Sequence, residues 1–274
     1  MRHLTLNKNC SIPILGFGTW QLTEKEGRKA VETALDVGYR HLDTADIYGN
    51  HKQVGRAIDT SNISREDIFL TSKVWHSDLE ARQIKDNCKR FLEELQTDYL
   101  DLLLIHWPNN NIDIRESLRA LNELKQDELI KSIGVSNFTI NHLKEAKETD
   151  LNFSNNQVEF HPSLYQDELK EFCDNNDIIM TAYSPLAQGQ DLQLPIIKEV
   201  AKKYNKPECQ VVLNWIMQKD IVAIPRSSNP KHIRENFQAH QWKLKEEDIK
   251  KIDSKATSNN RLINPSIAEF DYKT

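Results

Sequence analysis

The chain of 274 residues is long enough for a single α/β barrel, which typically takes roughly 250 residues. Hydrophobic residues make up 38% and charged residues 28%, so we expect a substantial core under a well-solvated surface. The 36 Lys and Arg residues against 41 Asp and Glu residues give a formal charge of −5, which argues against a nucleic-acid partner or an anionic membrane surface.

The cysteines and the start of the chain exclude further classes. Cys10, Cys88, Cys173 and Cys209 form no CxxC pair and no Cys/His cluster, so a structural zinc site has no support. The first residues lack the apolar run of a signal peptide, and no stretch approaches the ~20 apolar residues of a membrane span. We therefore expect a cytoplasmic protein with no bound metal and no membrane partner.

One pattern repeats along the chain: a short apolar run, a polar loop and an amphipathic stretch. Eight apolar runs follow one another at roughly 30-residue spacing, which is typical of βα units; they are residues 12–18, 39–43, 67–75, 98–108, 129–138, 155–160, 177–185 and 220–227. Continuous apolar strands that alternate with helices indicate a parallel sheet covered by helices, and eight such units favour closure into a barrel. We predict one (β/α)₈ TIM-barrel domain over residues 1–274. A small N-terminal β-hairpin precedes the barrel, and a short C-terminal tail follows it.

Two amphipathic stretches illustrate the predicted helices. Residues 23–26, Thr-Glu-Lys-Glu, have the spacing of a capping box, and the helix they open turns Ala30, Val31, Ala34 and Leu35 inward. In residues 78–95 the apolar side chains recur near helical period with charges opposite; they are Leu79, Ile84, Cys88, Phe91, Leu92 and Leu95.

Polar side chains follow three neighbouring strands. Asp43 ends the second apolar run, Tyr48 lies in its loop, Lys73 is near the end of the third run, and His106 follows the aliphatic residues of the fourth. Singly, each has an ordinary structural explanation, since a strand-end Asp can cap a helix and a Lys can extend its amine to solvent. Together they bring an acid, a phenol, an amine and an imidazole to the barrel mouth where catalytic groups lie in this fold.

This combination suits one chemistry. A phenol has an ordinary pKa of about 10, and an adjacent ammonium stabilises the phenolate and lowers that value. A carboxylate would keep the ammonium charged, and an imidazole beside the phenol can donate a hydrogen bond to a carbonyl oxygen. The four groups therefore predict protonation of an oxygen whose carbon receives a hydride.

Seven motifs in this order resemble the aldo-keto reductase family: LDTADIYGN, SKVW, LIHWP, GVSNF, NQVEFHP, AYSPL and IPRSS. The short length and the ending NNRLINPSIAEFD are similar to its 2,5-diketo-D-gluconate reductase B or methylglyoxal reductase branch. The resemblance implies that Tyr48 donates the proton, Lys73 lowers its pKa, Asp43 pairs with Lys73, and His106 orients the carbonyl. It also implies NADPH-dependent reduction of aldehydes and small ketones, such as methylglyoxal and 2,5-diketo-D-gluconate.

The cofactor site fits a barrel better than a Rossmann domain. Residues 16–21, GFGTWQ, lack the third glycine of a dinucleotide fingerprint. Barrels bind phosphate on the loops after their seventh and eighth strands, here residues 182–190 and 224–236. In the second loop Asn229 can cap a helix that begins with Pro230, and the N-terminus of that helix would attract an anion.

The family resemblance assigns individual cofactor contacts. Tyr183 is expected to stack on the nicotinamide, and Ser136, Asn137 and Gln157 to bond its carboxamide. The full expected set is Thr19, Trp20, Asp43, Ser136, Asn137, Gln157, Tyr183, Ser184, Leu186, Arg226, Ser227, Ser228, His232, Glu235 and Asn236. Family members commonly have Lys at position 226 and Arg at position 232. The first difference keeps the positive charge, so we expect NADPH to be preferred and NADH to bind more weakly. The second removes a permanent charge, so we expect that preference to be moderate.

Three tryptophans follow the first, third and fourth apolar runs. Trp20, Trp75 and Trp107, with Tyr48 and His106, are the expected substrate-binding residues. Few residues remain after the last helix to build a long lid, so we expect an open or small pocket for a short polar carbonyl, in a monomer.

Two other functions remain open at this point. A sensor or regulatory protein on the same fold would bind the cofactor with little turnover, but the chain has all four catalytic residue types. A metal-dependent barrel hydrolase would need converging ligands, and His106, Asp43 and His161 do not make a persuasive set.

Overall fold

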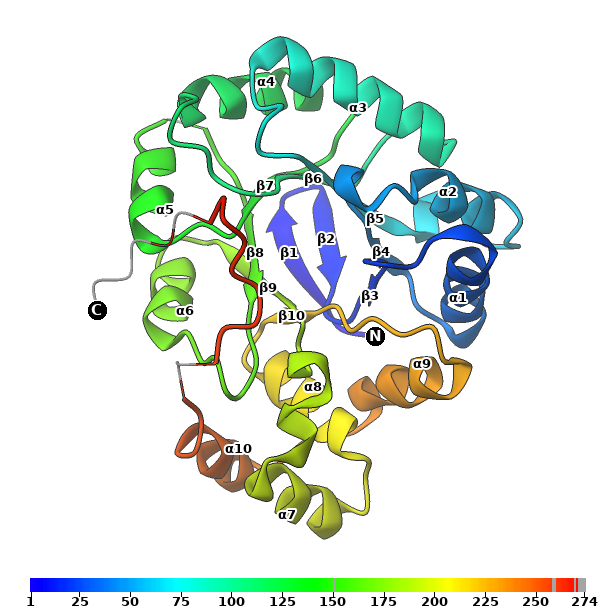
Figure 1. Cartoon of the computed structure of the whole chain (residues 1–274), viewed down its shortest axis with the longest axis vertical. Helices are drawn as coiled ribbons and strands as arrows, with labels where there is room; N and C mark the ends of the chain where they lie inside the picture. Colours follow the sequence, from blue (N-terminus) through cyan, green and yellow to red (C-terminus); the bar gives the residue numbers. More distant parts are fainter. Residues whose placement is uncertain (150, 258–259, 269, 271–274) are drawn as a thin grey trace.

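The computed structural model describes residues 1–149, 151–257, 260–268 and 270. Within these residues, eight parallel strands form one sheet whose order follows the chain, and helices surround it (Figure 1). The strands are β3 (Phe17–Gly18), β4 (His41–Asp43), β5 (Phe69–Val74), β6 (Leu102–Ile105), β7 (Ile133–Ser136), β8 (Asn155–Glu159), β9 (Ile179–Tyr183) and β10 (Val222–Ala223).

The sheet closes between its first and last strands. Leu15 and Ala223 form a parallel bridge, the Gly16 amide donates to the Ala223 carbonyl at 2.8 Å, and the Gly18 amide donates to the Pro225 carbonyl at 3.1 Å. A Cβ on Gly18 would lie 2.9 Å from the Ile224 carbonyl oxygen, so the absent side chain is what allows this close approach. The predicted (β/α)₈ barrel is confirmed.

Most helices bury one face, whereas α8 (Glu208–Gln218) is buried on all sides over its residues 210–217. In α3 the buried residues are Ile84, Cys88, Phe91, Leu92 and Leu95, as the helical period predicted, although the helix begins at Ala81, after the buried Leu79. The described helices are α1 (Glu24–Val37), α2 (His51–Asp59), α3 (Ala81–Leu95), α4 (Ile114–Gln126), α5 (Ile140–Lys147), α6 (Asp167–Asp174), α7 (Pro195–Tyr204), α8 (Glu208–Gln218), α9 (Pro230–Phe237) and α10 (Glu246–Asp253).

The start of α1 differs from its prediction. Thr23 occupies the N-cap position, but its side chain makes no capping hydrogen bond, so the predicted capping box is wrong. Glu24 has φ = 53°, which is left-handed, and the first turn therefore departs from helical geometry. The chain before the helix also folds tightly onto it, since a Cβ on Gly27 would lie 2.3 Å from the Leu22 carbonyl carbon.

The N-terminal hairpin closes one end of the barrel. The antiparallel strands β1 (His3–Asn7) and β2 (Cys10–Pro13) confirm the predicted hairpin, and Figure 1 shows it across the barrel interior. The Asn7 amide group donates to Ser132 Oγ at 3.3 Å, just before β7, and Cys10 Sγ lies 3.8 Å from the Asp101 carbonyl, just before β6. Because the hairpin covers the ends where strands begin, the functional groups are left to the opposite end.

The core is continuous through the barrel wall, and β6 is buried along its whole length. Trp215 on α8 stacks on Phe160 with ring centroids 5.6 Å apart. Among the described residues, no helix combines the length and apolar composition that crossing a bilayer requires.

Candidate active site

A buried ion pair lies at the ends of β4 and β5. Lys73 Nζ donates to Asp43 Oδ1 at 2.5 Å and to the Thr44 carbonyl at 2.8 Å, and the lysine side chain is fully buried. The other carboxylate oxygen of Asp43 accepts a hydrogen bond from Gln157 Nε2 at 2.7 Å. The carboxylate is therefore held from two sides, and the lysine has a donor left for a third partner.

That third partner is Tyr48. Its Oη lies 3.5 Å from Lys73 Nζ, at the end of the short 3₁₀ helix η1 (Asp46–Tyr48). The loop is fixed by the buried Asn50, which accepts from Thr44 Oγ1 at 2.7 Å and donates to the Thr19 carbonyl at 2.8 Å. Asn50 was missed from the sequence, because an asparagine in a loop carries no signal of its partners.

His106 completes the group from β6. Its amide donates to the Val74 carbonyl at 2.9 Å, and its carbonyl accepts from Asn137 Nδ2 at 3.0 Å. The imidazole lies edge-on to Tyr48 and to Trp75, at centroid distances of 5.8 and 5.3 Å. Its Nδ1 is buried and has no hydrogen-bond partner within the described part of the chain. The structure thus brings all four predicted catalytic residues together.

Burial controls the protonation states. It lowers the pKa of His106 well below the ordinary value, with Lys73 adding to the effect, so the imidazole is neutral at pH 7. Burial also lowers the pKa of Lys73, although Asp43 opposes it. The pKa of Tyr48 is raised well above 10 by burial and then by the charge of Asp43. The net direction is opposite to the lowering expected from an adjacent ammonium alone, because burial and the Asp43 carboxylate both disfavour the phenolate.

The expected nicotinamide residues form a connected network at the ends of β7, β8 and β9. Ser136 Oγ donates to the Gln157 carbonyl at 2.8 Å, and Tyr183 Oη donates to Asn137 Oδ1 at 2.8 Å. Since Gln157 also bonds Asp43, the network joins this side of the mouth to the ion pair.

The expected phosphate residues gather at the start of α9. Asn229 Oδ1 accepts from the Lys231 amide at 2.9 Å with Pro230 as the first helical residue, which confirms the predicted cap. The first turn carries no acidic residue, while Ser228 and His232 are exposed beside it. Such a helix N-terminus fits an anionic phosphate.

Arg226 reaches this region from the barrel closure. It is exposed, and its Nε donates to the Trp20 carbonyl at 3.0 Å, which fixes the direction of the guanidinium. The remaining expected cofactor residues lie around the same end of the barrel. Thr19 Oγ1 donates to the Asp43 carbonyl at 2.9 Å, and Ser227 Oγ accepts from the Asn229 amide at 3.1 Å. Ser184 and Leu186 follow β9, and Glu235 and Asn236 lie on α9.

The three tryptophans differ in exposure. Trp20 is 42% exposed, Trp75 is half-buried against His106, and Trp107 is only 4% exposed. Trp107 is covered by Phe270, with ring centroids 5.8 Å apart. The C-terminal tail therefore returns to the mouth and contributes to its wall, which the expectation of a short tail did not include.

The mouth of this closed barrel holds a phenol, a buried ammonium and a neutral imidazole, a combination that suits protonation of a carbonyl oxygen. Residues 14–257 match the profile described as the Aldo/keto reductase family. The chain belongs to the aldo/keto reductase family, and it is an oxidoreductase that acts on carbonyl groups.

Individual relatives agree with this family. The chain is 40% identical over 242 residues to methylglyoxal reductase DkgA of Yersinia pestis, covering 87% of both chains. It is 39% identical over 302 residues to the glycerol 2-dehydrogenase (NADP(+)) of Saccharomyces cerevisiae, covering 98% of this chain and 96% of the relative. A crystal structure provisionally described as a 2,5-diketo-D-gluconic acid reductase B superposes with a TM-score of 0.95 at 33% identity, covering 100% of this chain and 98% of the other. The expected resemblance is confirmed.

Proposed function

We propose that this protein reduces aldehydes and small ketones to alcohols, with NADPH as the hydride donor and Tyr48 as the proton donor. The substrates are 2-oxoaldehydes such as methylglyoxal and keto-sugar acids such as 2,5-diketo-D-gluconate. The observation that carries the proposal is the position of Tyr48 Oη, 3.5 Å from the buried Lys73 ammonium and beside the neutral His106. When bound, the cofactor would supply the hydride to the carbonyl carbon.

Side chains of the protein would supply the proton to the carbonyl oxygen. His106, as a neutral imidazole, can donate its N–H to the carbonyl oxygen and hold the substrate in line. As the carbon is reduced, that oxygen becomes an alkoxide, which is a far stronger base than a phenolate, so Tyr48 can give up its proton despite its raised pKa. The O–H bond of Tyr48 breaks, the O–H bond of the alcohol forms, and the negative charge moves to Tyr48 Oη.

Lys73 and Asp43 act on this new charge. The ammonium stabilises the phenolate, and Asp43 at 2.5 Å keeps the ammonium protonated against the cost of burial. Gln157 in turn holds the second carboxylate oxygen, which fixes Asp43 in place.

The donor set at the barrel closure supports NADPH. Tyr183, Ser136, Asn137 and Gln157 would hold the nicotinamide end. The other end would lie on Thr19, Trp20, Ser184, Leu186, Ser227, Ser228, His232, Glu235 and Asn236, with Arg226 at the 2′-phosphate. The similarity to the NADP(+)-dependent glycerol 2-dehydrogenase of Saccharomyces cerevisiae supports this choice.

A short polar substrate suits the mouth. Its expected walls are Trp20, Trp75 and Trp107, which would pack on a small carbonyl compound while His106 and Tyr48 bond its oxygen. We also propose a single-domain, cytoplasmic monomer.

The test is turnover with purified protein. Oxidation of NADPH and of NADH should be followed with methylglyoxal, 2,5-diketo-D-gluconate, glycolaldehyde and a bulky steroid ketone. We expect turnover with the two proposed substrate types and a lower KM for NADPH than for NADH. Cofactor binding without oxidation on any carbonyl would instead support a regulatory protein.

A further inference from the structure

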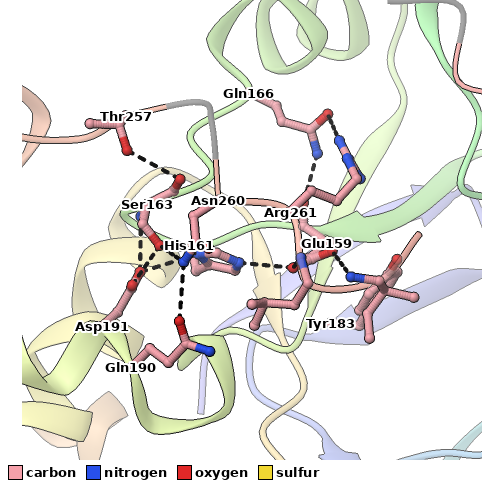
Figure 2. A network of polar contacts seen from close by, with 12 residues as sticks. Glu159, His161, Ser163, Gln166, Tyr183, Gln190, Asp191, Thr257, Asn260 and Arg261 are labelled. Atoms are coloured by element: carbon pink, nitrogen blue, oxygen red, sulfur yellow. Dashed lines mark hydrogen bonds and ion pairs between the residues drawn. The ribbon is translucent and has the colours of Figure 1, made fainter.

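A second buried group of charges lies at the same end of the barrel (Figure 2). Glu159 is the last residue of β8, His161 follows two residues later, and Asp191 begins the 3₁₀ helix η4 (Asp191–Gln193). His161 Nε2 is 3.0 Å from Glu159 Oε1, and His161 Nδ1 is 3.2 Å from Asp191 Oδ2. All three side chains are at most 2% exposed. We call these three residues the acid–histidine cluster.

The charges within the cluster are coupled. Burial acts to lower the pKa of His161, but its hydrogen bonds with Asp191 and Glu159 outweigh burial and raise it. Burial likewise acts to raise the pKa of Asp191, yet the bonds from His161 and Ser163 leave it lowered. Glu159 from β8 and Asp191 from η4 face the imidazole, and Arg261, from the chain that crosses the cluster, lies next to it and bonds Gln166. An imidazolium between two carboxylates is the charge state this arrangement favours.

The cluster does not have the form of a catalytic or metal site. Ser163 Oγ lies 3.1 Å from His161 Nδ1, but it donates to Asp191 Oδ1 at 2.6 Å and accepts from Asn260 Nδ2 at 3.0 Å. Both imidazole nitrogens already face carboxylates, so His161 has no nitrogen left to take a proton from a serine. Among the residues that the structure describes, no group of His, Cys, Asp and Glu is arranged to hold a metal ion.

The cluster instead holds the chain's C-terminal segment, residues 260–263. Glu159 Oε1 accepts from the Leu262 amide at 2.9 Å, and Oε2 accepts from the Ile263 amide at 3.0 Å. Next to these bonds, the Asn260 amide donates to the Ser163 carbonyl at 3.1 Å. A buried carboxylate that accepts two backbone N–H groups fixes the path of that backbone.

The held segment leads to the expected substrate wall. Side chains alternate along a strand, so Glu159 points to the same side of β8 as Gln157, which bonds Asp43 of the catalytic group. Beyond the segment, Phe270 packs on Trp107, and the Arg261 guanidinium lies 4.1 Å above the Phe270 ring. The segment thus joins the cluster to an aromatic contact at the mouth.

We propose that Glu159, His161 and Asp191 are positioning residues: they seat residues 260–263 at the barrel mouth and so hold Phe270 against Trp107 as one wall of the substrate pocket. The substrate part of this proposal rests on the proposed carbonyl reduction. The proposal that the cluster fixes residues 260–263 does not depend on the proposed carbonyl reduction.

Amide hydrogen exchange in the ligand-free protein tests whether the cluster fixes residues 260–263. In Glu159→Gln and in His161→Gln, exchange at Leu262 and Ile263 should become about tenfold faster or more, because charge-assisted hydrogen bonds are lost. Asp248→Asn is the matched control: it removes another buried acid, on α10, which accepts from Lys203 and Tyr204 of α7, and should leave these two amides unchanged. Unchanged protection of Leu262 and Ile263 in both cluster variants would overturn the proposal.

If the cluster variants fail to fold, a variant that changes no buried charge still tests the proposal. Leu262→Pro removes one N–H donor without altering any charge. It should speed exchange at Ile263 and raise KM for methylglyoxal in the same direction as Glu159→Gln. Full protection of Ile263 with an unchanged KM in this variant would show that the bond from the Leu262 amide to Glu159 does not seat the segment.

Steady-state kinetics test the substrate part. Glu159→Gln should raise KM for methylglyoxal several-fold, change kcat less, and leave the Kd of NADPH unchanged. Phe270→Ala should do the same, and the double variant should be no worse than the poorer single variant, because both changes act through one contact. Faster exchange with an unchanged KM would overturn the assignment to substrate positioning. No turnover with wild-type protein would reject the proposed function alone, since the exchange experiment still decides the holding.

Discussion

The barrel mouth holds two groups of buried charges that differ in how completely they are satisfied. In the acid–histidine cluster both imidazole nitrogens face carboxylates, and both oxygens of Glu159 accept backbone N–H groups. In the catalytic group the carboxylate of Asp43 is equally well held, but Tyr48 stands 3.5 Å from Lys73, and Nδ1 of His106 has no partner within the described residues.

This difference separates a group that fixes the position of the backbone from a group that can bind and react with a ligand. A fully hydrogen-bonded charge group gains nothing from a new partner, whereas a buried polar atom without a partner is costly and marks a place where a ligand can supply one. We therefore expect changes in the catalytic group to act mainly on rate, and changes in the cluster to act mainly on stability and on KM.

The largest expected effect is that of Tyr48→Phe. Removing the general acid should lower kcat by about 10²–10⁴-fold, while the Kd of NADPH, measured by fluorescence titration, stays nearly the same. A variant with kcat within threefold of wild type would remove Tyr48 from the role of proton donor. Tyr204→Phe, the same change at a tyrosine of α7 that bonds Asp248, is the control that should leave kcat nearly unchanged.

The next effects come from the ion pair. Lys73→Met should be severely impaired in kcat, because the phenolate loses its neighbouring charge, and Asp43→Asn should be impaired less. Breaking a buried pair also costs about 3–5 kcal/mol of stability, so urea unfolding must accompany the kinetics. If Asp43→Asn proved the slower of two folded variants, Asp43 would act more directly than we propose.

Arg226→Ala should act on cofactor choice. A charge-assisted bond to the 2′-phosphate is worth about 1.5–3 kcal/mol, which corresponds to about 10- to 150-fold in NADPH affinity. NADH binding should be nearly untouched, and Arg82→Ala, at an exposed arginine of α3, is the control. Equal losses for NADPH and NADH would place Arg226 on another part of the cofactor.

The pH dependence of the unfolding free energy tests whether His161 of the acid–histidine cluster is an imidazolium. The pKa of His161 is raised on folding, so its stabilisation is complete below its unfolded pKa of about 6.5 and is lost as pH rises through the folded pKa. The difference in unfolding free energy between wild type and His161→Gln should therefore be largest below about pH 6.5 and shrink as pH rises through the folded pKa of His161. A difference that grew with pH would contradict the imidazolium.

The smallest effect is expected from Asn229→Ala. Loss of the side-chain cap of α9 should cost about 1 kcal/mol of stability and weaken NADPH binding slightly. Thr23→Ala is the matched control, because Thr23 makes no capping bond and its loss should cost less. Equal losses in thermal unfolding would contradict this reading of the two helix starts.

The sequence was sufficient for the barrel and for the placement of the four candidate catalytic residues. Continuous apolar runs located the strands, and Asp43, Lys73 and His106 lie at or next to the last residues of β4, β5 and β6. The cap at Asn229 was also predictable, since Asn followed by Pro is a local signal.

The cluster was not predictable in the same way. Asp191 lies 30 positions from His161, and the groups that Glu159 binds are backbone amides, which every residue has. The raised pKa of Tyr48 was missed because burial was not visible, and the capping box at Thr23 failed because the left-handed Glu24 breaks the first turn.

The closure of the barrel bears on how the protein is made. Asp43, Tyr48, Lys73 and His106 all lie in the first 106 residues, yet the bridge between Leu15 and Ala223 joins segments from opposite ends of the chain. A nascent chain emerging from the ribosome exposes the catalytic side chains well before the segment that closes the sheet around them. The outer edge of β3 stays unpaired until the last strand is synthesised, so closure of the barrel is a late step in folding.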